Sequence, residues 1–505
     1  MTRRPTSVTP VDAEPAAVTE RLATDAGELD PSIVAALVDA GVEVSTLVTD
    51  RNDSGRDWWP LAIGWAARGE IPARPKAVAR PADVHGVAAV LRIAQAARIA
   101  VTPMAGRSGV CGGAVPVFGG IALDLTGLHG LIDLDEESLV ADVAAGTFGP
   151  DLEDALRSTG ACYTLGHWPQ SMDISTVGGW LACRGAGQYS TRYGKIEDMV
   201  LGLEVVLADG RIIHTDGAGP RAATGPNLTQ LFVGSEGTLG VITAARLRVH
   251  PVPTHNARRA YAFADLAAGL EACRLLLRRG ATPAVLRLYD EAESRRNFDR
   301  TDTCVLVVFD EAEELLLDAT MAMVDEECTG ASRLDDAHVD RWLAERNDTS
   351  ALAPLWRAGI VVDTVEVAAR WSVLAALCDD VRAALREIGG TIAASVHESH
   401  AYPDGACVYF TFAGRRPEDT PLDAAAWQED YYRRAWDTVM AVTRRHGAAI
   451  SHHHGIGLNR GRHLAEALGP SFDVLVAIKG ALDPAGILNP GKLGLPGPFG
   501  DAPWP

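Results

Sequence analysis

Residues 103–113 read PMAGRSGVCGG and come directly after the apolar segment IAVT at residues 99–102. Because glycine, alanine and serine have little or no side chain, successive backbone N–H groups of such a loop can hold phosphate oxygens. The loop lacks the glycine-lysine ending of a P-loop and the glycine spacing that opens a Rossmann site. Taken alone, a glycine-rich loop is more often only a turn, so its function depends on the rest of the chain.

Two further glycine-rich loops lie in the same half of the chain. Residues 166–179, GHWPQSMDISTVGG, combine polar side chains with a closing pair of glycines. Residues 232–243, FVGSEGTLGVIT, predict a tight turn that leads into an apolar strand. Three such loops between residues 103 and 243 are improbable as turns alone, so we expect them to bind a large anionic cofactor.

Helical and strand patterns alternate along the chain, which predicts an α+β protein. Residues 199–207 and 211–215 flank an Ala-Asp-Gly hairpin turn. Beyond residue 254 helical patterns dominate, and the apolar stretches 303–309 and 408–412 predict isolated strands. The change of texture places a domain boundary near residue 254.

Composition and charge narrow the class of protein. The 505 residues carry 46 Lys and Arg against 66 Asp and Glu, a formal net charge of −20 without a dense basic block, which argues against a nucleic-acid partner. The eight cysteines form no C-x-x-C pair, which indicates thiols in a reducing cytoplasm. No stretch approaches the roughly 20 apolar residues of a transmembrane segment. A peripheral contact with a membrane and a homodimer stay open.

Several motifs, in the same order along the chain, resemble the PCMH-type FAD-binding domain of the vanillyl-alcohol oxidase superfamily. They are residues 103–113, STVGG at 175–179, YGKIED at 193–198, GSEGTLGVIT at 234–243 and NPGK at 489–492. Three more are similar to the alkyldihydroxyacetonephosphate synthases of ether-lipid synthesis: GHWPQS at 166–171, GPRAATG at 219–225 and SHHHGIG at 451–457. The resemblance covers most of the chain beyond residue 50.

This resemblance implies a two-subdomain FAD-binding domain with an α/β cap domain that carries the substrate pocket. The expected segments are a flexible N-terminal arm (1–25), a helical segment (26–69), the FAD-binding domain (70–253), the cap (254–470) and a C-terminal tail that returns to the FAD-binding domain (471–505).

The resemblance also implies which residues hold FAD. The pyrophosphate is expected at Ala105, Gly106, Arg107, Ser108, Gly109 and Val110 and at Pro169, Gln170, Ser171, Ser175, Thr176, Gly178 and Gly179. Arg184 completes this set, and the adenosine and isoalloxazine are expected along Glu236, Thr238, Gly240, Val241 and Ile242. Some relatives bond the flavin covalently through a histidine of the first loop. Here Arg107 and Ser108 stand there, so we expect non-covalent FAD. Arg107 is either a cation beside the cofactor or a solvated loop residue.

The predicted catalytic residues lie in the second half. Tyr409 matches the tyrosine that the synthases use as acid and base, and His452, His453 and His454 match the histidines that position substrate and move protons. A fully extended chain would turn His453 away from its neighbours, so all three can share a pocket only if the backbone bends at Gly455. Without the resemblance, Tyr409 would be read as a core tyrosine.

Two departures bear on the substrate. Leu352 and Ala353 stand where the synthases carry an Arg-Asp pair for the substrate phosphate. Either Arg346 or Arg357 replaces that pair, or the substrate has no phosphate. We therefore predict an FAD-dependent oxidoreductase that takes a hydride from a small alcohol or 2-hydroxy acid. The alternative is a redox-neutral alkylglycerone-phosphate synthase that exchanges an acyl group for a fatty alcohol.

Two further candidates are a metal site and one carboxylate. His397 and His400, with the histidine triplet, offer nitrogen ligands, but the metal motif of the related hydroxyacid dehydrogenases is not reproduced, and Tyr409 stands about where its last histidine would be. The prediction is therefore a site without metal. Glu366 is either a pocket carboxylate or a surface residue.

Overall fold

The first glycine-rich loop begins at the end of a strand in a four-stranded sheet. The computed structural model describes residues 8–22, 28–215, 221–348 and 352–504. The strand order is β2-β4-β6-β5, and β4, β6 and β5 run parallel. The strands are β2 (Glu43–Ser45), β4 (Ala77–Arg80), β5 (Val101–Met104) and β6 (Ile121–Asp124). Helices α1 (Pro31–Asp39) and α4 (Val84–Ala97) pack on this sheet. Helix α1 starts with an aspartate cap, because the Asp30 side chain accepts the Ser32 N–H and Pro31 suits the first helical position.

The other two glycine-rich loops border a five-stranded antiparallel sheet of order β11-β10-β12-β8-β7. Its strands are β7 (Leu131–Asp135), β8 (Val140–Ala144), β10 (Val200–Val206), β11 (Ile212–His214) and β12 (Val241–Arg248). Helices α5 (Gly149–Arg157), α6 (Val177–Cys183) and α9 (Leu228–Phe232) cover it with apolar side chains. The predicted hairpin between residues 206 and 212 is present.

The second half of the chain builds a seven-stranded sheet, the cap sheet, of order β17-β14-β16-β15-β19-β20-β18. Its strands are β14 (His255–Phe263), β15 (Val285–Tyr289), β16 (Cys304–Ala312), β17 (Ser332–Leu334), β18 (Ile360–Arg370), β19 (Thr391–Tyr402) and β20 (Gly405–Arg415). Strands are present at both predicted positions, 303–309 and 408–412, but they are longer than expected and are not isolated. Both belong to one antiparallel sheet and are buried along almost their whole length, so they carry no alternating pattern in the sequence.

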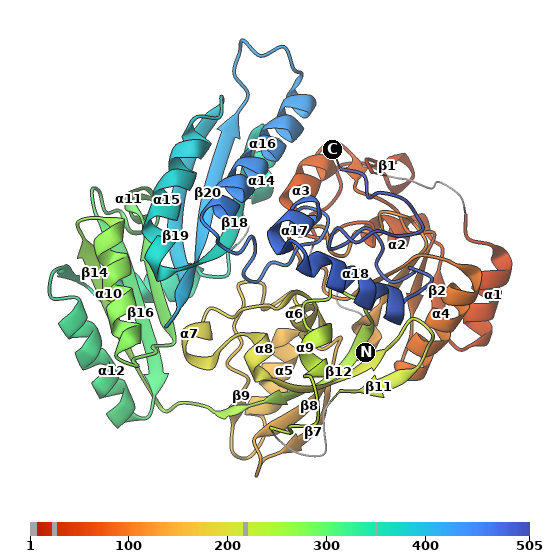
Figure 1. Ribbon diagram of the computed structural model, residues 1–505, viewed down its shortest axis with the longest axis horizontal. Helices are drawn as coiled ribbons and strands as arrows, with labels where there is room; N and C mark the ends of the chain where they lie inside the picture. Colours follow the sequence, from red (N-terminus) through yellow and green to blue (C-terminus); the bar gives the residue numbers. More distant parts are fainter. Residues whose placement is uncertain (1–7, 23–27, 216–220, 349–351, 505) are drawn as a thin grey trace.

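Four helices cover the outer face of the cap sheet (Figure 1). They are α10 (Leu266–Arg278), α12 (Glu314–Glu327), α15 (Trp371–Arg386) and α16 (Ala424–Arg445). Helix α11 (Glu291–Phe298) contacts β15, β16 and β19, α13 (Ala337–Glu345) contacts β14 and β16, and α14 (Leu352–Arg357) contacts the edge strand β18. The shorter elements are η1 (Pro15–Ala17), β1 (Thr19–Glu20), α2 (Val48–Asp53), α3 (Pro60–Ala66), β3 (Glu70–Ile71), η2 (Leu125–Gly127), β9 (Tyr163–Thr164), α7 (Ser190–Tyr193), α8 (Ile196–Met199) and β13 (His250–Pro251).

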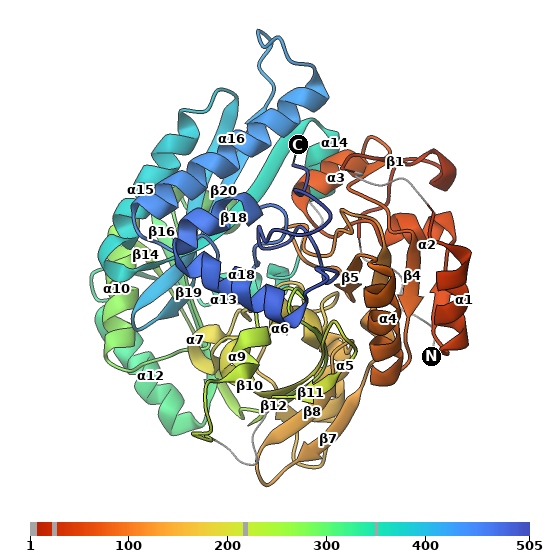
Figure 2. The same cartoon turned by 45° about the vertical axis from the view of Figure 1, so that its right-hand side comes forward.

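The last two helices of the chain are α17 (Gly461–Leu468) and α18 (Ser471–Leu482). Figure 2 shows α18 in dark blue between the strands of the cap sheet and those of the first half of the chain. After α18 the backbone pairs with the start of β5, where Val101 N–H donates to the Ile487 carbonyl at 2.8 Å. In the described part of the chain, no helix is both long enough and apolar enough to cross a bilayer.

Part of the predicted N-terminal arm packs on the rest of the protein. Residues 8–22 lie on the body of the protein, where β1 pairs in parallel with β3. Val8, Val18 and Leu22 are buried, and Arg21 pairs with Glu429 at 2.7 Å. These apolar anchors are spaced too widely to give a periodic signal. Residues 1–7 and 23–25 of the predicted arm lie outside the described residues.

Candidate active site

The three glycine-rich loops meet in space although they are far apart in the chain. A β-carbon at Gly106 would lie 2.2 Å from the Ile174 carbonyl oxygen, so the first and second loops touch through their backbones. A β-carbon at Gly237 in the third loop would lie 3.0 Å from Pro103. Only glycine allows the first approach, which explains part of the glycine content of the first loop.

The C-terminal tail joins the first and third loops. The Asn489 side-chain amide donates to the Gly113 carbonyl at 3.1 Å and to the Glu236 carbonyl at 2.7 Å. Lys492 is fully buried and donates to the Val115 carbonyl at 2.7 Å. The NPGK motif therefore holds the loops together from behind.

The loops leave backbone uncovered on one side. Gly109 and Gly179 are exposed. A β-carbon would meet only the Asp57 carboxylate at 3.7 Å in the first case and only the Thr176 hydroxyl at 3.3 Å in the second. An uncovered backbone between two touching loops suits an anionic group bound by N–H donors. The loops therefore fit the pyrophosphate of FAD.

Arg107 is not a solvated loop residue. Its side chain is buried, and its guanidinium pairs with the Asp53 carboxylate at 2.8 Å. Its φ of +55° lies in the left-handed region, where glycine is the usual residue. The arginine thus ties the first loop to α2.

Several residues that were predicted to contact the cofactor form hydrogen bonds or packing contacts within the protein. The Ser175 hydroxyl accepts the Trp180 indole N–H at 2.6 Å, and Thr176 caps α6. Arg184 contacts Gln230 at 3.2 Å, while Thr238 donates to the Ser235 carbonyl at 2.7 Å. Gly178 packs on Ala145 and Gly240 on Val205, whereas Val241 and Ile242 are buried in β12. Ala105, Ser108, Val110, Pro169, Gln170 and Ser171 lie on the two touching loops. Direct contact of these residues with FAD stays a prediction.

Tyr409 and the histidine triplet form one cluster. The Tyr409 hydroxyl lies 2.5 Å from Nε2 of His453 and 3.3 Å from Nε2 of His454. Nδ1 of His452 lies 2.8 Å from Nδ1 of His453. The backbone of residues 452–454 is bent rather than extended. All three histidines therefore join the cluster, which a fully extended backbone would not allow.

Burial sets the protonation of the cluster. It raises the pKa of the Tyr409 phenol well above its usual value and lowers the pKa of His453 well below its usual value. It also lowers the pKa of His452 to about 3 and that of His454 to about 4. At neutral pH the phenol is therefore protonated and the imidazoles are neutral.

A second layer of polar side chains supports Tyr409. The His397 ring stacks on the Tyr409 ring with centroids 5.0 Å apart. Its Nδ1 lies 2.8 Å from the buried Glu293 carboxylate, and its Nε2 lies 2.7 Å from the Arg287 guanidinium. With Nδ1 protonated, Nε2 accepts from Arg287. A bulge in β19 between residues 398 and 400 lets His400 reach the cluster as well, with rings of His400 and His453 4.8 Å apart.

The geometry allows two groups of metal ligands. His400, His452 and His453 place one nitrogen each within 4.8 Å of one another, and Glu366, Cys407 and His453 form a second such group. Imidazole groups of this kind suit zinc or another transition metal. A site without metal stays a prediction.

The two candidates to replace the missing Arg-Asp pair lie in different places. These candidates are Arg346 and Arg357. Arg357 is on the surface and pairs with Asp12 at 2.9 Å. Arg346 lies over the Tyr189 ring at 5.0 Å and near Trp342 at 5.8 Å. Leu352 packs against the apolar core of the cap. Of the two arginines, Arg346 is the one near the cluster, because it lies at the same Trp342 ring as Arg287, which contacts His397.

Sequence reasoning missed four residues near the cluster. Arg287 and Glu293 were hidden in ordinary strand and helix patterns, and Trp342 in an amphipathic helix. His167 was quoted only as part of a motif. It is fully buried, both of its ring nitrogens lack a hydrogen-bond partner among the described residues, and burial lowers its pKa to about 3. The only signal for His167 was its position within the second glycine-rich loop.

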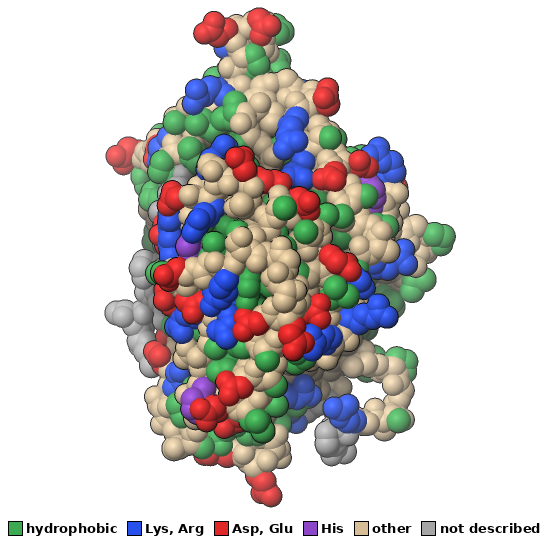
Figure 3. Space-filling model, turned by 90° about the vertical axis from the view of Figure 1, so that its left-hand side faces the viewer, with side chains coloured by type: hydrophobic (Ala, Val, Ile, Leu, Met, Phe, Trp, Pro, Cys, Tyr) green, Lys and Arg blue, Asp and Glu red, His purple; other side chains and the backbone are tan. Residues whose placement is uncertain are grey.

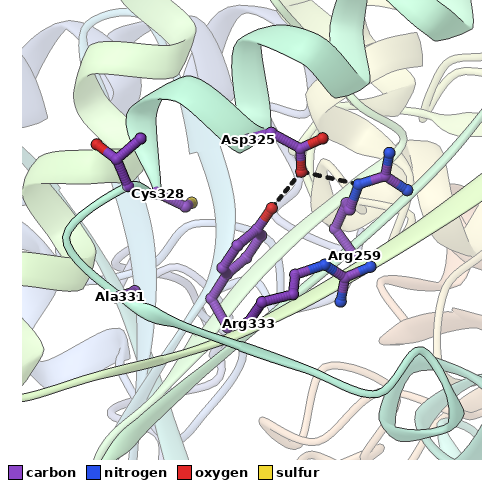
Figure 4. Close-up of a pocket in the computed structure, with 7 residues that line it drawn as sticks. Arg259, Asp325, Cys328, Ala331 and Arg333 are labelled. Carbon is purple, nitrogen blue, oxygen red and sulfur yellow. Dashed lines mark hydrogen bonds and ion pairs between the residues drawn. The ribbon is translucent and has the colours of Figure 1, made fainter.

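A separate surface pocket of about 620 Å³ lies at the far edge of the cap sheet (Figure 4). Arg259, Tyr261, Asp325 and Arg333 line it, and Asp325 accepts hydrogen bonds from Arg259 and Tyr261. It shares no residue with the tyrosine–histidine cluster. Over the face seen in Figure 3, Lys and Arg side chains are mixed with Asp and Glu rather than gathered in one basic area.

The fold and the loops define an FAD-dependent enzyme. Residues 75–216 match the family model for the FAD binding domain, and residues 252–493 match that for the C-terminal domain of FAD linked oxidases. The chain belongs to the FAD-linked oxidoreductases. It is 30% identical over 441 residues to the uncharacterized FAD-linked oxidoreductase YgcU of Escherichia coli K12, a match that covers 83% of this chain and 89% of that protein.

Two other comparisons agree with the resemblance to the synthases. The alkyldihydroxyacetonephosphate synthase of Dictyostelium discoideum is 26% identical over 463 residues, which cover 84% of this chain and 74% of that protein. A solved alkyldihydroxyacetonephosphate synthase superposes with a TM-score of 0.77 at 23% identity, over 95% of this chain and 88% of that one. At this identity the structural match establishes the fold.

Proposed function

We propose that this enzyme oxidises a small 2-hydroxy acid or alcohol at the face of its cofactor next to Tyr409. When bound, FAD supplies the hydride acceptor. The observation that carries the proposal is the Tyr409 hydroxyl held 2.5 Å from His453, with two arginines in the next layer of side chains.

The tyrosine and histidine would move the substrate proton. A hydroxyl that loses a hydride from its carbon must also lose its proton, so the site needs a base within hydrogen-bond reach. His453 is neutral because burial lowers its pKa well below the usual value. It can therefore accept the proton that the Tyr409 hydroxyl passes on. His454, 3.3 Å from the same oxygen, offers a second acceptor.

The two arginines favour an acidic substrate. Arg287 and Arg346 lie 5.7 Å and 5.8 Å from the same Trp342 ring. Arg287 Nε and Arg346 NH1 are buried without a hydrogen-bond partner in the described chain, and neither residue forms an ion pair with another described residue. A carboxylate that received these donors would satisfy them, because arginine binds carboxylates through paired N–H groups. This supports a 2-hydroxy acid over a neutral alcohol.

The alternative is the redox-neutral synthase reaction. The histidine triplet and the relatives named alkyldihydroxyacetonephosphate synthase favour it. Leu352 speaks against it, because an apolar side chain in the cap core cannot bind the substrate phosphate. An acyl exchange would leave the flavin oxidised at the end of the reaction.

An anaerobic spectral screen tests the proposal. We expect the visible flavin band to bleach with at least one small 2-hydroxy acid, and the KM for that acid to rise about 10-fold to 100-fold in Arg346→Met, as the loss of one charged hydrogen bond predicts. Arg357→Met is the matched control, because Arg357 pairs only with Asp12 at the surface. A flavin that stays oxidised with every acid and alcohol, but catalyses exchange on acylated ketone phosphates, would establish the synthase reaction instead.

A further inference from the structure

The histidine segment, residues 451–457, is not held by secondary structure of its own. It forms neither helix nor strand. Gly455 and Gly457 have φ values of +78° and +53°, so the backbone turns twice within three residues. A segment of this kind is free to adopt many conformations unless outside contacts restrict it. The short distance from His453 to Tyr409 therefore needs an explanation from neighbouring elements.

Glu366 on β18 restrains the first half of the segment. Its side chain is fully buried beneath the histidines. Its Oε2 accepts the His452 backbone N–H at 2.5 Å, and its Oε1 accepts the His454 backbone N–H at 2.9 Å. Oε1 also accepts the Ser451 hydroxyl at 2.9 Å. One carboxylate thus binds the backbone on both sides of His453.

Arg460 keeps this carboxylate charged. Burial alone would raise the pKa of Glu366, but the Arg460 guanidinium, together with the hydrogen bond from the His454 backbone N–H, outweighs burial and lowers it to about 2. Arg460 is itself fully buried and lies 2.8 Å from Glu366 Oε1. It also donates to the Gly455 carbonyl at 2.8 Å. The ion pair and the segment therefore form one hydrogen-bonded unit.

Glu236 restrains the second half from the opposite side. It belongs to the third glycine-rich loop and has a φ of +51°. Its Oε1 accepts the Ile456 N–H at 2.5 Å, and its Oε2 accepts the Gly457 N–H at 2.8 Å. A β-carbon at Gly455 would lie 2.6 Å from Oε1, so the close approach requires glycine.

We propose that Glu366 and Glu236 are positioning residues that fix the histidine segment from two sides and so set the distance from His453 to the Tyr409 hydroxyl. Glu366 comes from the cap sheet and Glu236 from the FAD-binding half. The acid–base pair is therefore complete only when the two halves are docked. The catalytic meaning of this arrangement rests on the proposed function, but the arrangement itself can be tested without a substrate.

The test is amide hydrogen exchange on the FAD-loaded protein, read by mass spectrometry on peptides that contain residues 451–457. In Glu366→Gln an amide group faces backbone N–H donors and cannot accept from all of them. We expect about tenfold faster exchange at 452–454, since hydrogen bonds to charged groups are the stronger ones. In Glu236→Gln the acceleration should fall on 456 and 457.

The reactivity of the histidines provides a second readout. Carbethoxylation by diethyl pyrocarbonate, mapped residue by residue, should become several-fold faster at His453 and His454 in both variants. Glu153→Gln is the matched control. Glu153 is also buried and accepts the Leu165 N–H at 2.9 Å and the Thr164 hydroxyl, but it lies on α5 and does not touch the histidine segment. It should leave both readouts at residues 451–457 unchanged.

The outcomes separate this inference from the proposed function. Unchanged exchange in both variants would overturn the inference. So would faster exchange with unchanged histidine reactivity, because the carboxylates would then hold backbone without placing the side chains. If either variant fails to bind FAD or to fold, the other one decides, since each restrains a different half of the segment. A wild-type flavin that no acid or alcohol reduces would count against the proposed function alone.

Discussion

The cofactor loops and the tyrosine–histidine cluster are built from different kinds of groups. The loops approach one another through glycine backbones, as at Gly106 and Ile174, and present N–H groups rather than side chains. The cluster, by contrast, presents side chains rather than backbone groups. It consists of polar side chains from β15, β19 and β20 of the cap sheet and from the histidine segment, and these side chains contact one another.

The difference follows from the chemistry each region has to perform. A pyrophosphate carries a fixed charge, and many weak N–H donors can bind it without changing their own protonation. Moving a proton needs groups whose pKa values are shifted by burial and neighbours. A region of the first kind can be local in sequence, whereas a region of the second kind draws on residues far apart. Four predictions probe this contrast.

The largest effect is expected from Tyr409→Phe. Removing the hydroxyl between His453 and His454 should lower the rate of substrate-dependent flavin reduction by about 10²-fold to 10⁴-fold, the usual contribution of acid–base catalysis. FAD content should stay unchanged, because the loops do not use Tyr409. Tyr431→Phe is the control: it removes a buried hydroxyl that bonds only to Thr391 at 3.0 Å. Equal rates in the two variants would contradict the role of Tyr409.

Gly106→Ala should break the other region. The new β-carbon would lie 2.2 Å from the Ile174 carbonyl, so the first two loops would have to separate. We expect a protein that purifies with little FAD, and a loss of about 1–3 kcal/mol in the free energy of unfolding from the forced overlap. The ratio of flavin absorbance to protein absorbance measures the FAD content. Gly160→Ala, with nothing within 4 Å, should bind FAD normally.

The pH dependence should carry the signature of buried histidines. Burial lowers the pKa of His454 to about 4 and that of His452 to about 3. Because the base must be neutral, the acid limb of kcat/KM should lie well below the ordinary histidine value of about 6.5. The free energy of unfolding should also decrease as the pH is lowered from about 6.5 to 4, because the unfolded chain binds protons there that the folded one does not. An inflection of kcat/KM near 6.5 would indicate solvated histidines.

The smallest effect is expected from Asn489→Ala. The amide donates to Gly113 and Glu236 carbonyls, and its loss should weaken the contact of the first and third loops by about 1 kcal/mol. We expect FAD to dissociate a few times faster, as measured by the rise of free-flavin fluorescence on dilution. The rate of the chemical step should be unchanged. A large loss of that rate would mean that the tail serves the cluster as well.

Much of the fold was predictable from short stretches. The FAD-binding motifs, α1 with its aspartate cap and the hairpin at residues 206–212 each rest on local rules for turns, caps and glycine. The cap sheet was not predictable in the same way, because its strands pair with partners far along the chain, as β15 pairs with β19 where Leu288 lies opposite Glu398. The anchoring of residues 8–22 was missed for the same reason.

The candidate site divides along a similar line. Tyr409 and the histidine triplet were found by their likeness to a motif, but their contact was not, since an extended segment would point His453 away. Arg287, Glu293 and Trp342 carried no local signal at all. They matter only because antiparallel pairing sets β15 beside β19, and β19 beside β20.

The sequence by itself indicated a large anionic cofactor, because N–H donors for phosphate groups lie in consecutive glycine-rich residues, and the resemblance of its motifs pointed to FAD. Only the tertiary structure decided where the histidines lie and which arginines face them. Burial, which shifts their pKa values, and the two carboxylates that hold residues 451–457 come from distant parts of the chain. Local sequence can specify a backbone conformation, whereas the environment of a titrating group is a property of everything packed around it.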